Sequence, residues 1–120
     1  MNKNLCNKLA NILEDYSIEE LETKRKKLSS WSDYHHARGI WSSTHYDKPW
    51  KERKYSCRDC VSIGSVVIWY EINYSLNDFW HENFWIDGSD EKVSFGDIGF
   101  LLGQIEIIRI RKRKNSVKEV

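Results

Sequence analysis

Apolar residues recur with helical spacing near the start of the chain. Leu5, Leu9, Ile12 and Leu13 occupy positions i, i+4, i+7 and i+8 of one stripe. Such a stripe is typical of an amphipathic helix that buries one side. The pattern therefore predicts a short first helix.

A second helix is predicted to begin at Ser17. Ser17 and Glu20 have the spacing of a capping box, in which each side chain bonds the other residue's backbone N–H. Tyr16 and Leu21 flank them at the positions of a hydrophobic staple. The apolar stripe then continues through residues 28, 31 and 35. Gly39 predicts the end of this helix, with residues 29–30 as an earlier alternative.

The period of the apolar residues changes to two after residue 61. One side of the predicted strand is apolar throughout, at Val66, Ile68, Tyr70, Ile72 and Tyr74. The other side is mixed, at Val67, Trp69, Glu71 and Asn73. Residues 75–78 have the composition of a turn and residues 79–87 form a second strand, so an antiparallel hairpin is predicted.

Shorter elements are predicted further along. Residues 87–90 form a turn, 91–95 a short strand, and 105–111 a last strand, while glycines at 96, 99 and 103 indicate a turn or a single helical turn capped by Ser94. Helices followed by a meander of strands predict an α+β fold, with two N-terminal helices packed on a three- to four-stranded antiparallel sheet. We divide residues 1–120, as a single domain, into a helical part (1–39), an aromatic-basic loop (40–60), a sheet (61–111) and a frayed tail (112–120).

Composition supports a folded protein outside the membrane. The 120 residues are 40% hydrophobic and 13% aromatic, which excludes a disordered chain. The N-terminal residues are polar, and no segment approaches the roughly 20 apolar residues that cross a bilayer. Three cysteines, an odd number, favour reduced thiols over a disulfide framework. We therefore expect a soluble, cytoplasmic protein with no membrane partner.

Charge is segregated along the chain although the net charge is only +1. Residues 24–60 carry ten basic and four acidic side chains, and residues 76–106 carry one basic and seven acidic. Residues 107–120 carry six basic and one acidic. These segments either neutralise one another in the fold or present charged surfaces to a partner.

Two groups of residues resemble pieces of a catalytic or metal site. Cys57 and Cys60 have the spacing of one zinc knuckle, which a histidine could complete, but strong zinc signals contain two such pairs. His35, His36 and Arg38 could carry acid–base chemistry, although adjacent helical residues point to different sides. Strand alternation also puts Glu71 and Glu82 on opposite faces. We therefore assign no catalytic residue, no metal site and no cofactor.

An aromatic-basic mixture forms the strongest candidate surface. Aromatic rings and cations interleave over residues 41–55, and a basic run follows over residues 107–114. Such mixtures bind proteins or stack on nucleic-acid bases, and they can also cover a sheet edge. The candidate partner-binding residues are Trp41, Tyr46, Trp50, Arg53, Tyr55, Arg109, Arg111 and Arg113.

These observations favour a small non-enzymatic protein that acts by protein–protein contact. Its concrete form is an inhibitor from a phage or mobile element that acts on a host defence or nucleic-acid enzyme, an idea based on the style of the sequence and on no motif. One alternative is a nucleic-acid-binding module that uses residues 41–55 and 107–114. A second alternative is a small metal-dependent hydrolase or nuclease. The sequence leaves the oligomeric state open.

Overall fold

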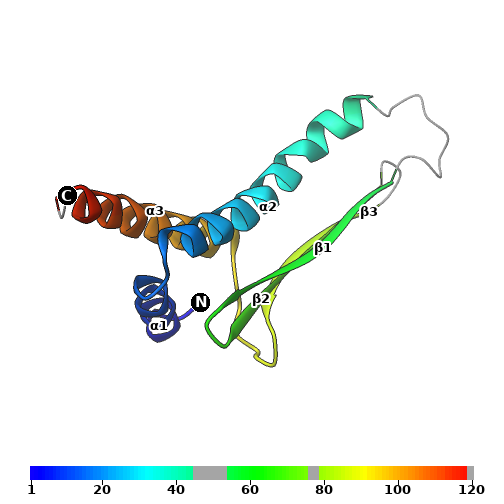
Figure 1. Ribbon diagram of the computed structural model, residues 1–120. Coiled ribbons are helices and arrows are strands. Elements are labelled where there is room, and N and C mark those ends of the chain that lie inside the picture. The colour runs from blue at the N-terminus through cyan, green and yellow to red at the C-terminus, as the bar shows by residue number, and fades with distance from the viewer. Residues whose placement is uncertain (45–53, 76–78, 119–120) are drawn as a thin grey trace.

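The computed structural model describes the backbone of residues 1–44, 54–75 and 79–118, and the side chains of residues 1–35, 56–73 and 81–115. In chain order the elements are α1 (Lys3–Glu14), α2 (Ile18–Thr44), β1 (Lys54–Ile63), β2 (Val66–Ser75), β3 (Phe79–Ile86) and α3 (Phe95–Lys118). The strands form one antiparallel sheet in the order β1-β2-β3 (Figure 1). The predicted α+β class is confirmed, and the described sheet has three strands.

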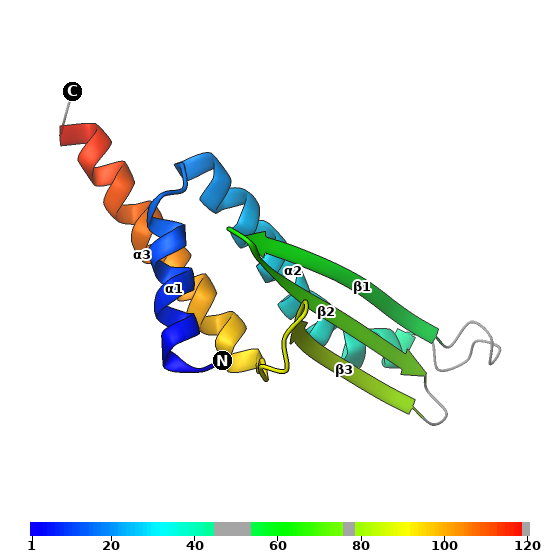
Figure 2. The ribbon, with the colours of Figure 1, turned by 90° about the horizontal axis from the view of Figure 1, so that it is seen from below.

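The helices are divided between one face and one end of the sheet. Helix α2 runs along one face, while α1 and α3 pack together at the end where the β1–β2 turn lies (Figures 1 and 2). The molecule measures 58 × 35 × 18 Å, and its radius of gyration is 17.3 Å. A compact domain of this length would have about 14 Å. This extended shape leaves the other face of the sheet without a covering helix among the described residues (Figure 2).

The core fills the space between α2, α3, α1 and the inner face of the sheet. The predicted apolar side of β2 is buried at every position whose side chain is described, from Val66 to Ile72. The remaining buried residues are Leu9, Leu13, Leu21, Leu28, Trp31, Val61, Ile63, Ile86, Ile98, Leu101, Ile105 and Ile108. Alternation in the strands and helical spacing in α1, α2 and α3 thus supply one common core.

The predicted starts of the first two helices are confirmed. Asn2 caps α1, because its side-chain oxygen accepts the Leu5 N–H at 2.8 Å. The capping box of α2 forms as its sequence predicts. Ser17 Oγ accepts the Glu20 N–H, and Glu20 Oε1 accepts the Ser17 N–H, both at 3.1 Å.

The predicted loop over residues 40–60 is wrong at both of its described ends. Helix α2 continues past Gly39 to Thr44, and β1 already begins at Lys54. A helical glycine costs only about 1 kcal/mol, so Gly39 does not stop a helix on its own. Strand β1 was missed because Cys57 and Asp59 occupy inner positions and hide its alternation. Pairing with β2 along its whole length, rather than local pattern, determines this strand.

The predicted strands at 91–95 and 105–111, and the frayed tail from residue 112, are also wrong. Residues 95–118 form α3, and Lys92 makes only an isolated bridge with Trp85. The buried residues Ile98, Leu101, Ile105 and Ile108 have helical spacing, but exposed isoleucines between them make the run look strand-like. Ser94 does cap this helix, since its Oγ accepts the Asp97 N–H at 3.2 Å. No helix in the described parts of the chain is long and apolar enough to span a membrane.

Candidate functional site

The two faces of the sheet differ in what covers them. The inner face packs against α2 and holds the buried strand residues. The outer face consists of Ser56, Arg58, Cys60, Ser62, Val67, Trp69, Glu71, Asn73, His81, Asn83 and Trp85, by the pairing of the strands. None of these described residues is buried. The outer face is therefore the largest ordered surface that the fold leaves open.

An aromatic–cation cluster lies at the centre of the outer face. Trp69 and Trp85 are cross-strand partners whose rings stack at 6.1 Å between centroids and 10° between planes. The Arg58 guanidinium lies over both rings, 5.3 Å from Trp69 and 5.7 Å from Trp85. The Arg58 side chain is 63% exposed. Arg58, Trp69 and Trp85, the outer tryptophan cluster, thus combine a guanidinium with two half-buried indoles at the surface.

The charges around this cluster are of both signs. Glu71 lies 3.8 Å from Arg58 Nε and 3.7 Å from His81 Nε2. Exposed pairs at such distances contribute little to stability. They do give the outer face a mixed, nearly balanced charge, which differs from the uniformly basic surface that a polyanion requires.

The inner face carries a first polar link to α2 at Asp59. The carboxylate accepts the Trp31 Nε1–H at 3.0 Å and lies 3.2 Å from Lys27 Nζ. Burial alone would raise the pKa of Asp59, but hydrogen bonds from Trp31, the Cys60 N–H and Lys27 outweigh it and hold the pKa below its usual value. Asp59 is thus kept charged and fixes β1 against α2.

A second polar link joins α2 to β3 through Glu82. The Glu82 side chain is only 8% exposed and lies 2.8 Å from His35 Nδ1. The Tyr70 hydroxyl donates to the same carboxylate at 2.8 Å. A carboxylate that orients an imidazole is one part of an acid–base site, and its buried position here also makes it a structural clamp.

The His35–Glu82 contact was not predicted. Among the notebook of candidate groups in the sequence, His35 and Glu82 belong to segments 47 positions apart, and nothing local couples them. The expected separation of Glu71 and Glu82 onto opposite faces is confirmed. The side chains of His36 and Arg38 lie outside the described ones, so only one of the three helical candidates can be placed.

The two cysteines of the predicted knuckle point away from each other. Both lie within β1, and an odd separation of three residues puts Cys57 on the inner face and Cys60 on the outer face. Burial raises the pKa of the Cys57 thiol despite its hydrogen bond with Tyr34. That hydrogen bond in turn raises the pKa of Tyr34. A strand therefore cannot bring both sulfurs to one zinc ion. Among the described residues, no group of three or more His, Cys, Asp or Glu could hold a metal.

The predicted basic residues of α3 are engaged within the fold. Arg109 lies 2.6 Å from Glu106 and 3.4 Å from Glu22. Arg111 pairs with Glu14, and Arg113 pairs with Glu22. Together with the Arg25–Glu106 pair at 3.2 Å, these contacts show that the segregated charges partly neutralise one another.

The two predicted binding segments lie at opposite ends of the molecule. Trp41 belongs to the last turns of α2 and Tyr55 to the first residues of β1, far from the C-terminal half of α3 (Figure 1). The side chains of Trp41 and Tyr55 are not described. Tyr46, Trp50 and Arg53 lie outside the described residues altogether. Residues 41–55 and 107–114 therefore do not form one continuous surface.

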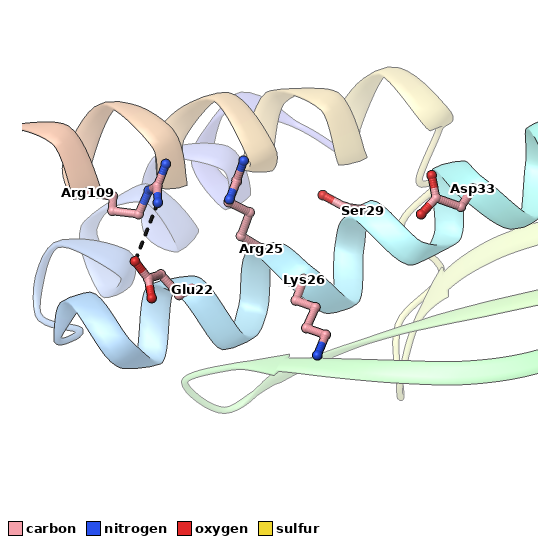
Figure 3. A pocket seen from close by; sticks show the side chains of 6 residues that line it. All are labelled: Glu22, Arg25, Lys26, Ser29, Asp33 and Arg109. Atoms are coloured by element: carbon pink, nitrogen blue, oxygen red, sulfur yellow. Dashed lines mark hydrogen bonds and ion pairs between the residues drawn. The ribbon is translucent and has the colours of Figure 1, made fainter.

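A shallow hollow between α2 and α3 is a further candidate. Its volume is about 540 Å³, and it is lined by Glu22, Arg25, Lys26, Ser29, Asp33 and Arg109 (Figure 3). Arg109 points from α3 toward Glu22, and its buried Nε has no hydrogen-bond partner in the described structure. The lining cations Arg25 and Arg109 are already paired with carboxylates. This hollow offers little free charge to a ligand.

Comparison with known protein families, curated proteins and solved structures found no match. The geometry of the described residues therefore carries the functional argument. Of the surfaces above, the outer tryptophan cluster combines exposure, order and binding chemistry most directly.

Proposed function

We propose that the protein is a small non-enzymatic binding protein that contacts another protein through the outer tryptophan cluster. The observation that supports this most is the stacked Trp69–Trp85 pair beneath Arg58 on a sheet face that no described helix covers. Tryptophan and arginine are the residue types that contribute most binding energy at protein interfaces. Here they are adjacent and held by paired strands.

The rigidity of this cluster favours binding. Trp69 and Trp85 belong to strands paired in continuous register, and the guanidinium restricts both rings further. A surface that is ordered before binding loses less side-chain freedom when a partner docks. A partner that covers both indoles also removes apolar area from water, at about 25 cal/mol per Å².

The charge around the cluster favours a protein over a nucleic acid. Glu71 lies beside Arg58 on the same face, where it would repel phosphates. Arg109, Arg111 and Arg113, the residues predicted to contact phosphates, already bind carboxylates of α1, α2 and α3. Nucleic-acid binding through residues 41–55 stays the alternative, and metal-dependent hydrolysis has lost its paired thiols.

A concrete form of this proposal is an inhibitor, from a phage or mobile element, of a host defence or nucleic-acid enzyme. A thin two-layer fold with one open face suits such a part, because it can cover a partner's surface while its own core stays intact. The enzyme that it would cover is to be identified by capture.

The test compares two variants in affinity capture from the native cell. Trp69→Ala/Trp85→Ala removes both outer rings, whereas Phe100→Ala removes an exposed ring from α3 and is the matched control. We expect the wild type and Phe100→Ala to retain the same protein and the double variant to lose it by at least about tenfold. Equal capture by all three proteins would contradict the proposal.

Labelled single- and double-stranded nucleic acid provides the second arm of the test. Fluorescence anisotropy at about 50 mM salt should show no binding that depends on the outer rings. Binding that falls steeply with salt, and is unchanged in the double variant, would favour the nucleic-acid alternative instead.

A further inference from the structure

Helix α3 carries an exposed apolar stripe on the side away from its core residues. Phe100, Ile107 and Ile110 are 37%, 59% and 45% exposed, and they are the large hydrophobic residues that stand out at the surface of the described chain. With Gly103 between them, they recur at intervals of three, four and three. That spacing matches the seam of paired helices. The opposite side of α3 bears Ile98, Leu101, Ile105 and Ile108, which the core already uses.

The glycine in this stripe leaves an open space. A Cβ atom placed on Gly103 would meet no atom within 4 Å, so nothing in the chain itself requires a glycine there. A mid-helix glycine costs about as much helix stability as any residue except proline. Its place in an exposed apolar stripe is explained if a large side chain from outside fills the space.

The stripe is complementary to a reversed copy of itself. If a second α3 packs antiparallel about an axis midway between residues 103 and 107, Phe100 faces Ile110 and Gly103 faces Ile107. Both pairings arise from one alignment, since both sets of numbers sum to 210. Ile107 of each helix would then occupy the space beside Gly103 of the other.

The charge along α3 favours the antiparallel orientation. Residues 95–108 contain Asp97 and Glu106 and no lysine or arginine, whereas residues 109–118 contain six basic residues and no acidic one. A parallel pair would bring the two basic halves together. An antiparallel pair apposes basic and acidic halves and also aligns the helix dipoles favourably.

We propose that the protein forms a homodimer through an antiparallel pair of α3 helices, with Phe100, Gly103, Ile107 and Ile110 at the contact. The C-terminal half of α3 extends beyond α1 and α2, so a second copy can reach it (Figures 1 and 2). About 16 residues of each helix, roughly 24 Å, would pack together. A contact of this size is at the small end of specific interfaces, which predicts a dissociation constant on the order of 10–100 µM.

Substitutions at Gly103 test the contact while leaving the monomer intact. Gly103→Leu adds apolar surface and helix propensity in open space, so the monomer should be at least as stable as the wild type. It also fills the space that Ile107 of the second copy needs. Sedimentation equilibrium at about 5–500 µM should show the dimer constant weakened at least tenfold in Gly103→Leu and much less in Gly103→Ala.

The alternative cause of an apolar stripe is simple adhesion or contact with a lipid surface. Either would strengthen in Gly103→Leu, because the stripe becomes more apolar. A wild type that stays monomeric up to about 500 µM, or tighter self-association of Gly103→Leu, would overturn the proposal. Monomeric binding of the wild type to vesicles of phosphatidylserine and phosphatidylcholine would overturn it as well.

Cross-linking tests the orientation. Phe100→Cys and Ile110→Cys chains are mixed and oxidised, and linked peptides are identified by mass spectrometry so that Cys6, Cys57 and Cys60 are distinguished. We expect the 100–110 link to exceed the 100–100 and 110–110 links at least severalfold. Predominance of the 100–100 link would show a parallel pair and overturn the antiparallel dimer. The outer face of the sheet takes no part, so this result is independent of the proposed function.

Discussion

The two faces of the sheet each hold a pair of stacked aromatic rings in different surroundings. On the inner face, Trp31 stacks on Tyr70 at 5.3 Å, and both rings are fully buried. On the outer face, Trp69 stacks on Trp85 at 6.1 Å, and both remain half-buried. The ring geometry is similar, but only the inner pair is enclosed by the fold. Stacking alone therefore does not tell a core aromatic from a binding aromatic.

The polar partners of the two ring pairs make the difference clear. The Trp31 N–H and the Tyr70 hydroxyl each donate to a carboxylate, Asp59 and Glu82, so the inner pair has its hydrogen-bonding groups satisfied. The outer pair is contacted by the mobile side chain of a cation, Arg58. Buried aromatic residues need fixed partners, whereas surface rings keep faces that a partner can cover.

The largest effect on this comparison is expected from truncating the inner ring. Trp31→Ala removes a fully buried indole and leaves Asp59 without its donor, so unfolding should cost about 3–5 kcal/mol less. Trp85→Ala, the matched outer substitution, should cost about 1 kcal/mol. Urea denaturation of both variants measures the difference. Equal losses would mean that the outer rings are structural and would break the contrast between the faces.

An intermediate effect is expected from the carboxylates. Glu82→Gln weakens a buried acceptor shared by His35 and Tyr70, and should reduce stability by about 1–3 kcal/mol. Glu71→Gln alters the exposed outer carboxylate and should change stability by less than about 1 kcal/mol. Thermal unfolding at neutral pH compares the two. A larger loss for Glu71→Gln would show that the outer face is held as firmly as the inner one.

The smallest effect is a dependence on pH that comes from Asp59. Its pKa is lower in the folded state than in the unfolded chain, so its charge stabilises the fold fully above about pH 4. This contribution, about 1 kcal/mol, is lost as the pH falls through the lower, folded-state pKa. In urea titrations from pH 7 to pH 2.5, Asp59→Asn should be less stable at pH 7 and show a shallower decline. An unchanged decline would assign the acid sensitivity to other groups.

Local signals predicted part of this architecture well. The capping box at Ser17 and the alternation from Val66 to Ile72 each depend on residues within a few positions, and both are confirmed. The same logic placed Trp31 on a buried stripe. Where the driving contacts are local, the sequence is sufficient.

Long-range contacts account for what was missed. Strand β1 is determined by its partner β2, and the helix at Ile105–Ile108 is determined by burial against α1 and α2, while its exposed isoleucines imitate a strand. The outer tryptophan cluster needs the register of three strands, which no pattern within one segment contains. The prediction that Trp69 and Trp85 are explained by the fold alone was correct about their strands and silent about their exposure.

The position of α3 in the chain has a consequence for biosynthesis. Ile98, Leu101, Ile105 and Ile108 complete the core against helices that emerge from the ribosome much earlier. Eighty residues separate the end of α1 from the start of α3, which corresponds to roughly 4–16 s of translation at 5–20 residues per second. During that interval the apolar stripes of α1 and α2 lack their last partner, so nascent chains of this protein are natural clients for chaperones.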